Sequence, residues 1–215
     1  MMKRNNFLIS TILILLAVVF TILVKVVDVE SVGVTGTNIG FYTLNKFIFD
    51  KIGVNMMWYY ITDWLGLIPI FIALVYALMG LVQLLKRRSL FKVDKDIMVL
   101  GLFYIIVIFI YIFFEKVIVN YRPILIDDLL EASYPSSHTL MTLCLCGSSI
   151  IFNKINFSSF FSKIINILSF FIIIIVTVIG RLLSGVHWFT DIVGGILIAS
   201  ALLMCFYSVL EYLNE

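Results

Sequence analysis

Long apolar segments alternate with shorter polar stretches along the whole chain. Six of these segments approach the roughly 20 mostly apolar residues that a helix needs to cross a bilayer. Their apolar residues cover every side of a helix instead of alternating as barrel strands do, and only helices or closed barrels can cross lipid. We therefore predict an all-α integral membrane bundle of six transmembrane helices, at residues 7–26, 64–85, 97–114, 139–152, 164–179 and 192–213. The fourth is the shortest, and the residues before it can extend it to a full span.

Basic residues predict the orientation of this bundle, because cytoplasmic loops are enriched in Lys and Arg. They precede the first segment and crowd the loops after the second and fourth segments (Lys3, Arg4; Lys86, Arg87, Arg88, Lys92, Lys95; Lys154, Lys163). With an even number of spans, these loops and both termini lie on one side. We predict that this side is cytoplasmic, in a multi-pass protein of the cell membrane. The extracytoplasmic side then carries residues 27–63, 115–137 and 180–190.

The stretch 27–63 contains apolar residues near helical spacing (Phe41, Leu44, Ile48 and Ile52), with polar residues such as Asn45 beside them. This pattern favours a short helix lying in the membrane surface, and a folded loop that caps the bundle is the alternative. The aromatic residues that follow are typical of a membrane-interface belt (Trp58, Tyr59, Tyr60 and Trp64).

Composition indicates that lipid is the solvent of this chain. Its 215 residues are 62% hydrophobic and 13% charged, with a mean hydropathy of +1.14, whereas a soluble domain is about half apolar and about a quarter charged. A net charge of +2 gives no reason to expect a nucleic acid partner. The 3 cysteines fall inside apolar runs, which predicts packing residues and neither a disulfide nor a metal site. We expect a single membrane domain over residues 1–215, with an uncleaved first helix.

The chain has 2 histidines, and both lie at the start of a predicted span on the extracytoplasmic side. His187 precedes Asp191 by four residues, so on a helix the two side chains share a face and can hydrogen-bond. A carboxylate bound to one ring nitrogen fixes the tautomer and leaves the other nitrogen free to attack. Arg181 comes just before this pair, and its planar guanidinium group could hold two phosphate oxygens.

The other histidine, His138, opens the fourth predicted span after a Tyr-Pro-Ser-Ser sequence. The first backbone N–H groups of a helix have no internal partners and bind anions. A phosphate held at Ser136 and Ser137 would therefore lie beside His138. Lys116 and Arg122 lie in the loop before this helix start; a single cation there is commonly an interfacial anchor.

These clusters, in this order and on one side of a six-helix chain, resemble the three signature motifs of the type 2 phosphatidic acid phosphatase superfamily. The family pattern is Lys-x6-Arg-Pro, then Pro-Ser-Gly-His, then Ser-Arg-x5-His-x3-Asp. The likeness covers about residues 115–195, which would form the catalytic core. The third motif is the most specific, because Arg181, His187 and Asp191 keep the family spacing.

The resemblance implies a phosphatase that works without a metal ion or another cofactor. His187 would be the nucleophile that forms a phosphohistidine, Asp191 would orient it, and His138 would protonate the departing oxygen. The resemblance assigns phosphate binding to the remaining motif residues: Arg122, Arg181, Ser136, Ser137 and Lys116. Cations can replace a metal because phosphoryl transfer depends mainly on positioning and charge stabilisation.

Two substitutions change the second and third motifs. Ser137 replaces the family's glycine, and Gly180 replaces the serine before the arginine, which removes one hydroxyl donor. Backbone N–H groups survive the first change, so we expect phosphate binding to persist. The acidic residues of the same loop (Asp127, Asp128 and Glu131) are expected to form a solvated surface.

The first motif is shorter than the family's. Lys116 and Arg122 have five residues between them in place of six. On a continuous helix this change would move the two side chains from about 20° to about 120° apart, and Glu115 would take the lysine's register and repel a phosphate. Because residues before a proline resist the helical conformation, the loop before Pro123 could reset this register, and we expect Lys116 to reach the site.

We therefore expect a membrane enzyme that hydrolyses the phosphomonoester or pyrophosphate bond of a lipid phosphate. Undecaprenyl diphosphate, phosphatidylglycerol phosphate, phosphatidic acid and diacylglycerol diphosphate all fit. The same residues would serve a headgroup phosphotransferase, in which a lipid hydroxyl attacks the phosphohistidine in place of water. The other alternative is a non-catalytic lipid-binding protein with a decayed site. The sequence leaves the oligomeric state open.

Overall fold

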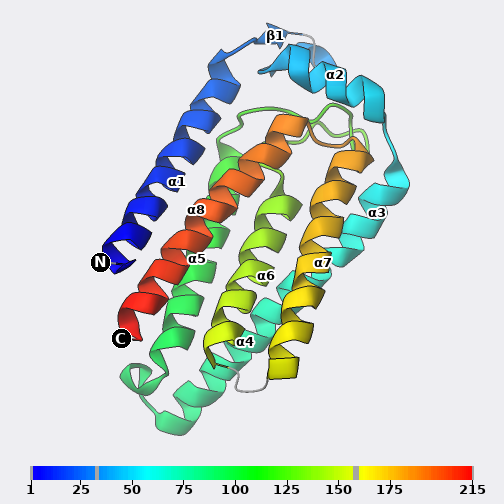
Figure 1. Ribbon diagram of the computed structural model, residues 1–215. Coiled ribbons are helices and arrows are strands. Elements are labelled where there is room, and N and C mark those ends of the chain that lie inside the picture. The colour runs from blue at the N-terminus through cyan, green and yellow to red at the C-terminus, as the bar shows by residue number, and fades with distance from the viewer. Residues whose placement is uncertain (1, 32–33, 157–159, 215) are drawn as a thin grey trace.

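The computed structural model describes residues 2–31, 34–156 and 160–214. Figure 1 shows long helices that run side by side, with a short helix across one end of the bundle. The all-α fold is therefore confirmed. The elements in chain order are α1 (Met2–Val26), β1 (Glu30–Ser31), η1 (Val34–Gly36), β2 (Asn38–Ile39), α2 (Tyr42–Ile52), α3 (Met56–Leu65), α4 (Leu67–Arg87), η2 (Leu90–Lys92), α5 (Lys95–Lys116), α6 (Ser137–Asn156), α7 (Phe160–Ser184) and α8 (Phe189–Leu213).

Among the described residues, 5 helical segments are long and apolar enough to cross a membrane: Asn5–Val26, Met56–Arg87, Lys95–Lys116, Lys163–Ser184 and Phe189–Leu213. The second of them combines α3 and α4, so helical structure begins at Met56 and not at Trp64. The outward faces of these helices carry many exposed large apolar side chains, such as Leu15, Phe71 and Phe109. An apolar exterior of this kind is solvated by lipid tails and not by water.

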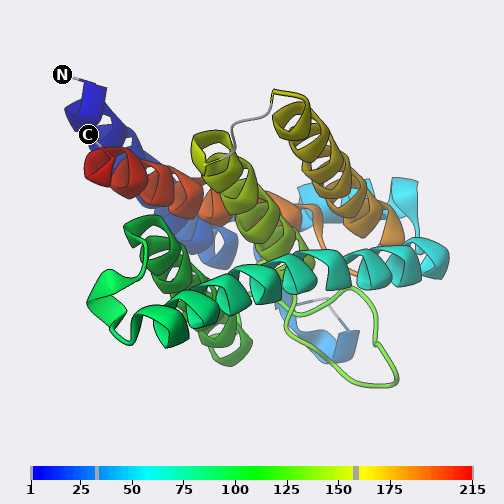
Figure 2. The same cartoon turned by 90° about the horizontal axis from the view of Figure 1, so that it is seen from below.

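The fourth predicted span corresponds to α6, which lies in the middle of the bundle. It contacts α4, α5, α7 and α8, and Figure 2 shows it between α8 and α7, with α4 and α5 below. Its buried polar side chains include Thr142, Ser149 and Asn153, and the Asn153 amide oxygen accepts a hydrogen bond of 2.9 Å from the Tyr76 hydroxyl. Because the other helices shield α6 from lipid, it is less apolar than they are, and its hydropathy signal is weak.

Small residues let α8 approach the start of α6. A Cβ atom added to Gly194 would lie 2.3 Å from the Tyr134 ring, and one added to Gly195 would lie 3.1 Å from the Thr139 side chain. Any larger side chain would push the two helices apart. This close packing holds together the two helix starts that follow the histidine motifs.

The predicted short helix exists as α2, and one of its polar residues is buried. Leu44 is 41% exposed, while the polar Asn45 is fully buried against the start of α8. The Asn45 side chain accepts a hydrogen bond of 3.1 Å from the Thr190 N–H and donates one of 2.9 Å to the Thr190 hydroxyl. Asn45 thus satisfies backbone at the N-terminus of α8, so α2 both caps the bundle and presents apolar residues outward.

Both termini lie at one end of the bundle, together with the loop between α4 and α5 (Figure 1). The opposite end carries α2, the segment between α5 and α6, and the turn between α7 and α8. This arrangement places the three motif regions at the same end, as the even number of spans predicts. Which side of the membrane that end faces stays a prediction.

Candidate active site

Four elements bring the predicted catalytic and phosphate-binding residues together. His138 lies in the first turn of α6, Arg181 in the last turn of α7, His187 in the turn between α7 and α8, and Arg122 in the segment between α5 and α6. Arg122, Arg181 and His187 are 9%, 0% and 3% exposed. Charged and titratable groups this deeply buried require specific partners or a specific use.

A tight turn places His187 ahead of α8. Gly185 adopts a φ of 68°, and a Cβ atom there would lie 2.2 Å from the Gly53 carbonyl oxygen, so this close approach requires glycine. The Nδ1 atom of His187 lies 3.1 Å from the carbonyl oxygen of Ser133. A carbonyl oxygen only accepts, so Nδ1 carries the proton and Nε2 keeps its lone pair. Nε2 is buried and has no hydrogen-bond partner among the described residues.

The expected direct hydrogen bond between His187 and Asp191 is not formed. His187 lies outside α8, and its Nδ1 atom is 3.9 Å from Asp191 Oδ2. The hydroxyl of Ser133 lies between them, 3.1 Å from His187 Nδ1, and donates a hydrogen bond to Asp191 Oδ2. Asp191 also accepts from the Trp188 N–H at 2.8 Å, so its carboxylate holds the backbone of the turn that carries His187.

The environment of His187 keeps its imidazole neutral. Burial, followed by the charges of Arg122 and Arg181, lowers the pKa of His187 well below its usual value of 6.5. A neutral ring with a free Nε2 lone pair is the form that can attack phosphorus.

Both buried arginines are paired with carboxylates that sequence reasoning did not assign to the site. The guanidinium of Arg181 donates a hydrogen bond of 2.7 Å to Asp63 of α3, and Arg122 Nε lies 3.0 Å from Glu131. Glu131 is therefore a partner of Arg122 and not part of a purely solvated surface. Arg181 Nε and Nη1 and Arg122 Nη1 are buried without partners among the described residues, so donors remain for an anion.

His138 also contacts a carboxylate, that of Asp63. Its Nε2 atom lies 3.1 Å from Asp63 Oδ1, the same oxygen that accepts from Arg181. Gly66, just after α3, packs on the ring, because a Cβ atom there would lie 2.9 Å from His138 Cδ2.

The start of α6 follows the sequence prediction. The Ser136 carbonyl accepts the first helical hydrogen bond from the Leu140 N–H at 2.9 Å, and the Ser136 N–H donates to the Asp191 carbonyl at 3.0 Å. The Ser136 hydroxyl is buried without a partner among the described residues. α6 begins at Ser137, so its free N–H groups point towards the end of the bundle that carries the histidines.

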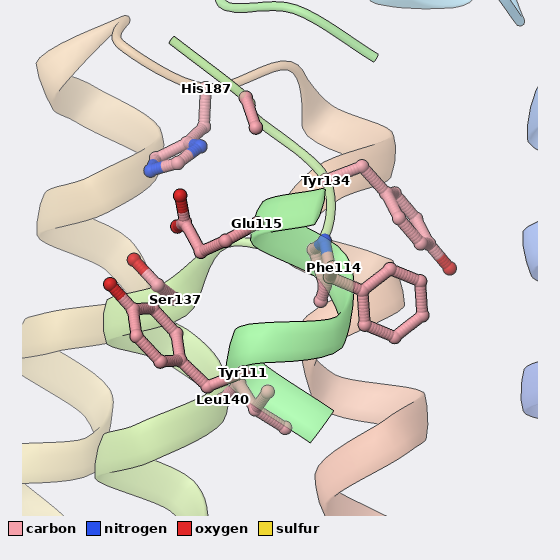
Figure 3. A pocket seen from close by; sticks show the side chains of 9 residues that line it. Tyr111, Phe114, Glu115, Tyr134, Ser137, Leu140 and His187 are labelled. Atoms are coloured by element: carbon pink, nitrogen blue, oxygen red, sulfur yellow. The ribbon is translucent and has the colours of Figure 1, made fainter. Parts of the chain in front are cut away.

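The segment after α5 does not continue the helix that carries Lys116. α5 ends at Lys116, and the chain then folds back on itself, with Tyr121 paired to Ala132. Lys116 and Arg122 are therefore not on one helix, so the angle of about 120° expected for a continuous helix does not describe how their side chains lie. Glu115, and not Lys116, lines the small cavity beside His187. Figure 3 shows the Glu115 carboxylate pointing towards the His187 ring, with the Ser137 hydroxyl below it.

A larger cavity of about 410 Å³ opens beside His138. Asp63 and His138 lie at its polar part, and Leu67, Ile70 and Met141 contribute apolar walls from α4 and α6. A polar end beside apolar walls is the combination that suits a phosphate attached to a hydrocarbon chain.

Sequence reasoning missed Asp63 and Ser133, and neither has a signal that one sequence would reveal. Asp63 lies 118 residues before Arg181 in the chain, and Ser133 lies 54 residues before His187. Among the described residues, no group of three or more His, Cys, Asp and Glu side chains is arranged to hold a metal ion.

The model of the PAP2 superfamily matches residues 97–215. A comparison with curated proteins finds no match. Among solved structures, the chain is similar to the first transmembrane PAP2-type phosphatidylglycerolphosphate phosphatase from Bacillus subtilis, with a TM-score of 0.66 and 15% sequence identity. That match covers 94% of this chain and 96% of the other. At this identity the likeness supports the fold, that of a multi-pass membrane protein.

Proposed function

The chain belongs to the PAP2 superfamily, and from this premise we propose that it is a lipid phosphate phosphatase at the extracytoplasmic face of the cell membrane. One observation carries the proposal: among the residues that the structure describes, the buried Nε2 of His187 has no partner, and it shares its site with unpartnered N–H groups of Arg122 and Arg181. A nucleophile beside buried cationic donors suits a phosphate group.

In the first step, His187 Nε2 attacks phosphorus, and the bond between phosphorus and the bridging oxygen breaks. Arg122, Arg181, the Ser136 hydroxyl and the first N–H groups of α6, which begins at Ser137, stabilise the charge on the phosphoryl oxygens. His138 donates its proton to the departing oxygen, which belongs to a lipid alcohol or, with a diphosphate, to a lipid monophosphate. The His187 phosphohistidine then remains on the enzyme.

In the second step, water attacks the phosphohistidine and His138 accepts a proton from it. The bond between phosphorus and His187 breaks, inorganic phosphate leaves, and both histidines return to their starting forms. No metal ion takes part, and the two arginines provide the positive charge that an ion would supply.

The substrate is a lipid because the site adjoins a cavity with apolar walls and a bundle with an apolar exterior. The hydrocarbon chain next to the headgroup would lie along Leu67, Ile70 and Met141. Four lipids are the test substrates: phosphatidylglycerol phosphate, undecaprenyl diphosphate, phosphatidic acid and diacylglycerol diphosphate.

The test is phosphate release by the purified protein from these four lipids in detergent, with and without a chelator. We expect release from at least one lipid, no loss with the chelator, and no release by His187→Ala. Activity that disappears with the chelator and returns with magnesium would contradict the metal-independent mechanism. Transfer of phosphate to an added lipid alcohol in preference to water would identify a phosphotransferase, and lipid binding without turnover would identify a non-catalytic protein.

A further inference from the structure

Helix α3 contributes a carboxylate to the active site from outside the region that matches the family. The family match begins at residue 97, whereas Asp63 lies near the end of α3 (Met56–Leu65). One oxygen of Asp63, Oδ1, is 2.7 Å from Arg181 Nη2 and 3.1 Å from His138 Nε2. Asp63 thus connects a phosphate-binding arginine to the histidine that would protonate the leaving oxygen.

We propose that Asp63 is a positioning residue that orients His138 and favours its imidazolium form, the form that protonates the leaving group. This inference rests on the proposed function, because it assigns Asp63 a part in the same reaction. Asp63 would serve His138 as an orienting carboxylate serves a catalytic histidine elsewhere: it holds the ring in one orientation and stabilises the imidazolium.

Packing holds α3 firmly against the site. A Cβ atom on Gly180 of α7 would lie 2.5 Å from Thr62 and 3.0 Å from the Trp58 ring, so glycine lets α3 approach α7. The Arg181 guanidinium lies over the Tyr59 ring, 5.0 Å from its centroid. Tyr59 therefore contacts Arg181 of the site, and the membrane-interface belt stays a prediction. These contacts hold the α3 backbone that carries Asp63 close to Arg181.

The charges that surround His138 make a carboxylate partner necessary. The buried surroundings and the positive charge of Arg181 disfavour the imidazolium form of His138, and the Asp63 carboxylate, 3.1 Å from its Nε2, opposes this effect. Among the described residues, the other titratable and charged groups near this part of the site are Arg122, His187, Tyr59, Tyr111 and Glu115. A bound phosphate adds negative charge as well, so the imidazolium is stabilised by substrate and Asp63 together.

Asp63 leaves room for a phosphate on Arg181. It uses Nη2 of the guanidinium, while Nε and Nη1 are buried without partners among the described residues. A phosphate can therefore bind Arg181 without displacing the carboxylate. The competing view, that Asp63 occupies the phosphate position and must leave before substrate binds, predicts tighter substrate binding when its charge is removed.

The deciding variant is Asp63→Asn, which keeps the size and the accepting oxygen but removes the charge. We expect kcat on a lipid phosphate to fall about 10- to 100-fold, since general acid catalysis contributes about 10²- to 10⁴-fold. Hydrolysis of an aryl phosphate, whose leaving group needs little protonation, should change little. The upper pH limb of kcat/KM on the lipid should move down by about one pH unit.

Three further variants make the result specific. In a His138→Ala background, Asp63→Asn should cause no additional loss, because the residue it serves is gone. Asp63→Glu keeps the negative charge, so its upper pH limb of kcat/KM should lie between those of the wild type and Asp63→Asn. Asp128→Asn, which removes an exposed carboxylate from the loop before α6, should leave the position of the upper pH limb unchanged.

A lower KM with unchanged kcat in Asp63→Asn would show that Asp63 competes with phosphate and would overturn the positioning role. Equal losses on lipid and aryl substrates, or a loss that persists in the His138→Ala background, would also overturn it. An active wild-type protein with an unaffected Asp63→Asn variant refutes this inference alone. A wild-type protein that hydrolyses no lipid phosphate refutes the proposed function as well.

Discussion

The two parts of the chain contribute to the site in different ways. Residues 97–215, which match the family, supply the two histidines, the two arginines and Asp191. The part before them supplies residues that hold these groups: Asn45 at the start of α8, Tyr59 over Arg181 and Asp63 between Arg181 and His138. The proposed reacting groups therefore come from one part of the chain, and residues that contact them come from the other.

The largest expected effects separate the two histidines. His187→Ala should abolish turnover on every substrate, because the nucleophile is needed whatever group leaves. His138→Ala should lose about 10²- to 10⁴-fold on a lipid phosphate and much less on an aryl phosphate. Steady-state rates on both substrates measure this, provided that the wild-type enzyme accepts the aryl compound. An active His187→Ala with an inactive His138→Ala would require the roles to be exchanged.

The next comparison ranks the cations. Arg122→Ala and Arg181→Ala should each lower kcat/KM by about 10²- to 10³-fold, because each removes a charged donor from the developing phosphoryl charge. Lys116→Ala should cost less, since Glu115 and not Lys116 lines the cavity beside His187. Arg87→Ala is the matched control, because Arg87 pairs with Asp94 in the loop at the other end of the bundle. Equal, severe losses at Lys116 and both arginines would show that lysine reaches the phosphate.

Much of this site could be predicted because motif spacing is local. Helix starts, the order of the motifs and the shared end of the bundle follow from hydropathy and from residues that are near one another in the sequence. The contacts of Asp63 and Ser133 join distant segments, and no periodicity reports such pairs. The burial of Asn45 was not predicted, because a pattern of apolar residues does not reveal a polar side chain that is buried with its hydrogen bonds satisfied, here by Thr190.

A stability measurement tests the supporting role of the first part of the chain. Asn45→Ala should destabilise the protein by about 1–3 kcal/mol, because it leaves the buried Thr190 N–H without its acceptor. Thermal unfolding in detergent should show this loss, and activity should fall with it because α8 begins beside His187. Asn38→Ala, which removes an exposed hydrogen bond to Ser31, should change little. Equal stability of both variants would contradict a positioning role for α2.

The smallest effect concerns protonation of His187. The chain has 2 histidines, so His138→Ala leaves a single imidazole whose NMR signals need no assignment. We expect the neutral ring with the proton on Nδ1, and a titration midpoint below the usual 6.5 because burial and the arginines lower this pKa. Between the lowered pKa of the folded state and about 6.5, the unfolded state binds more protons at His187 than the folded state. The free energy of unfolding should therefore fall as the pH is lowered through this range. A midpoint at or above 6.5 would contradict the described environment.

The central claim is that His187 carries the phosphoryl group, and rapid quenching after mixing with a ³²P-labelled lipid phosphate tests it directly. We expect a labelled protein whose phosphate is stable in base and labile in acid, as a phosphohistidine is, and whose label maps to the peptide that contains His187. His187→Ala should acquire no label, whereas Asp63→Asn should still acquire it. Turnover by the wild-type enzyme with no labelled intermediate, or with the label on another residue, would contradict the account.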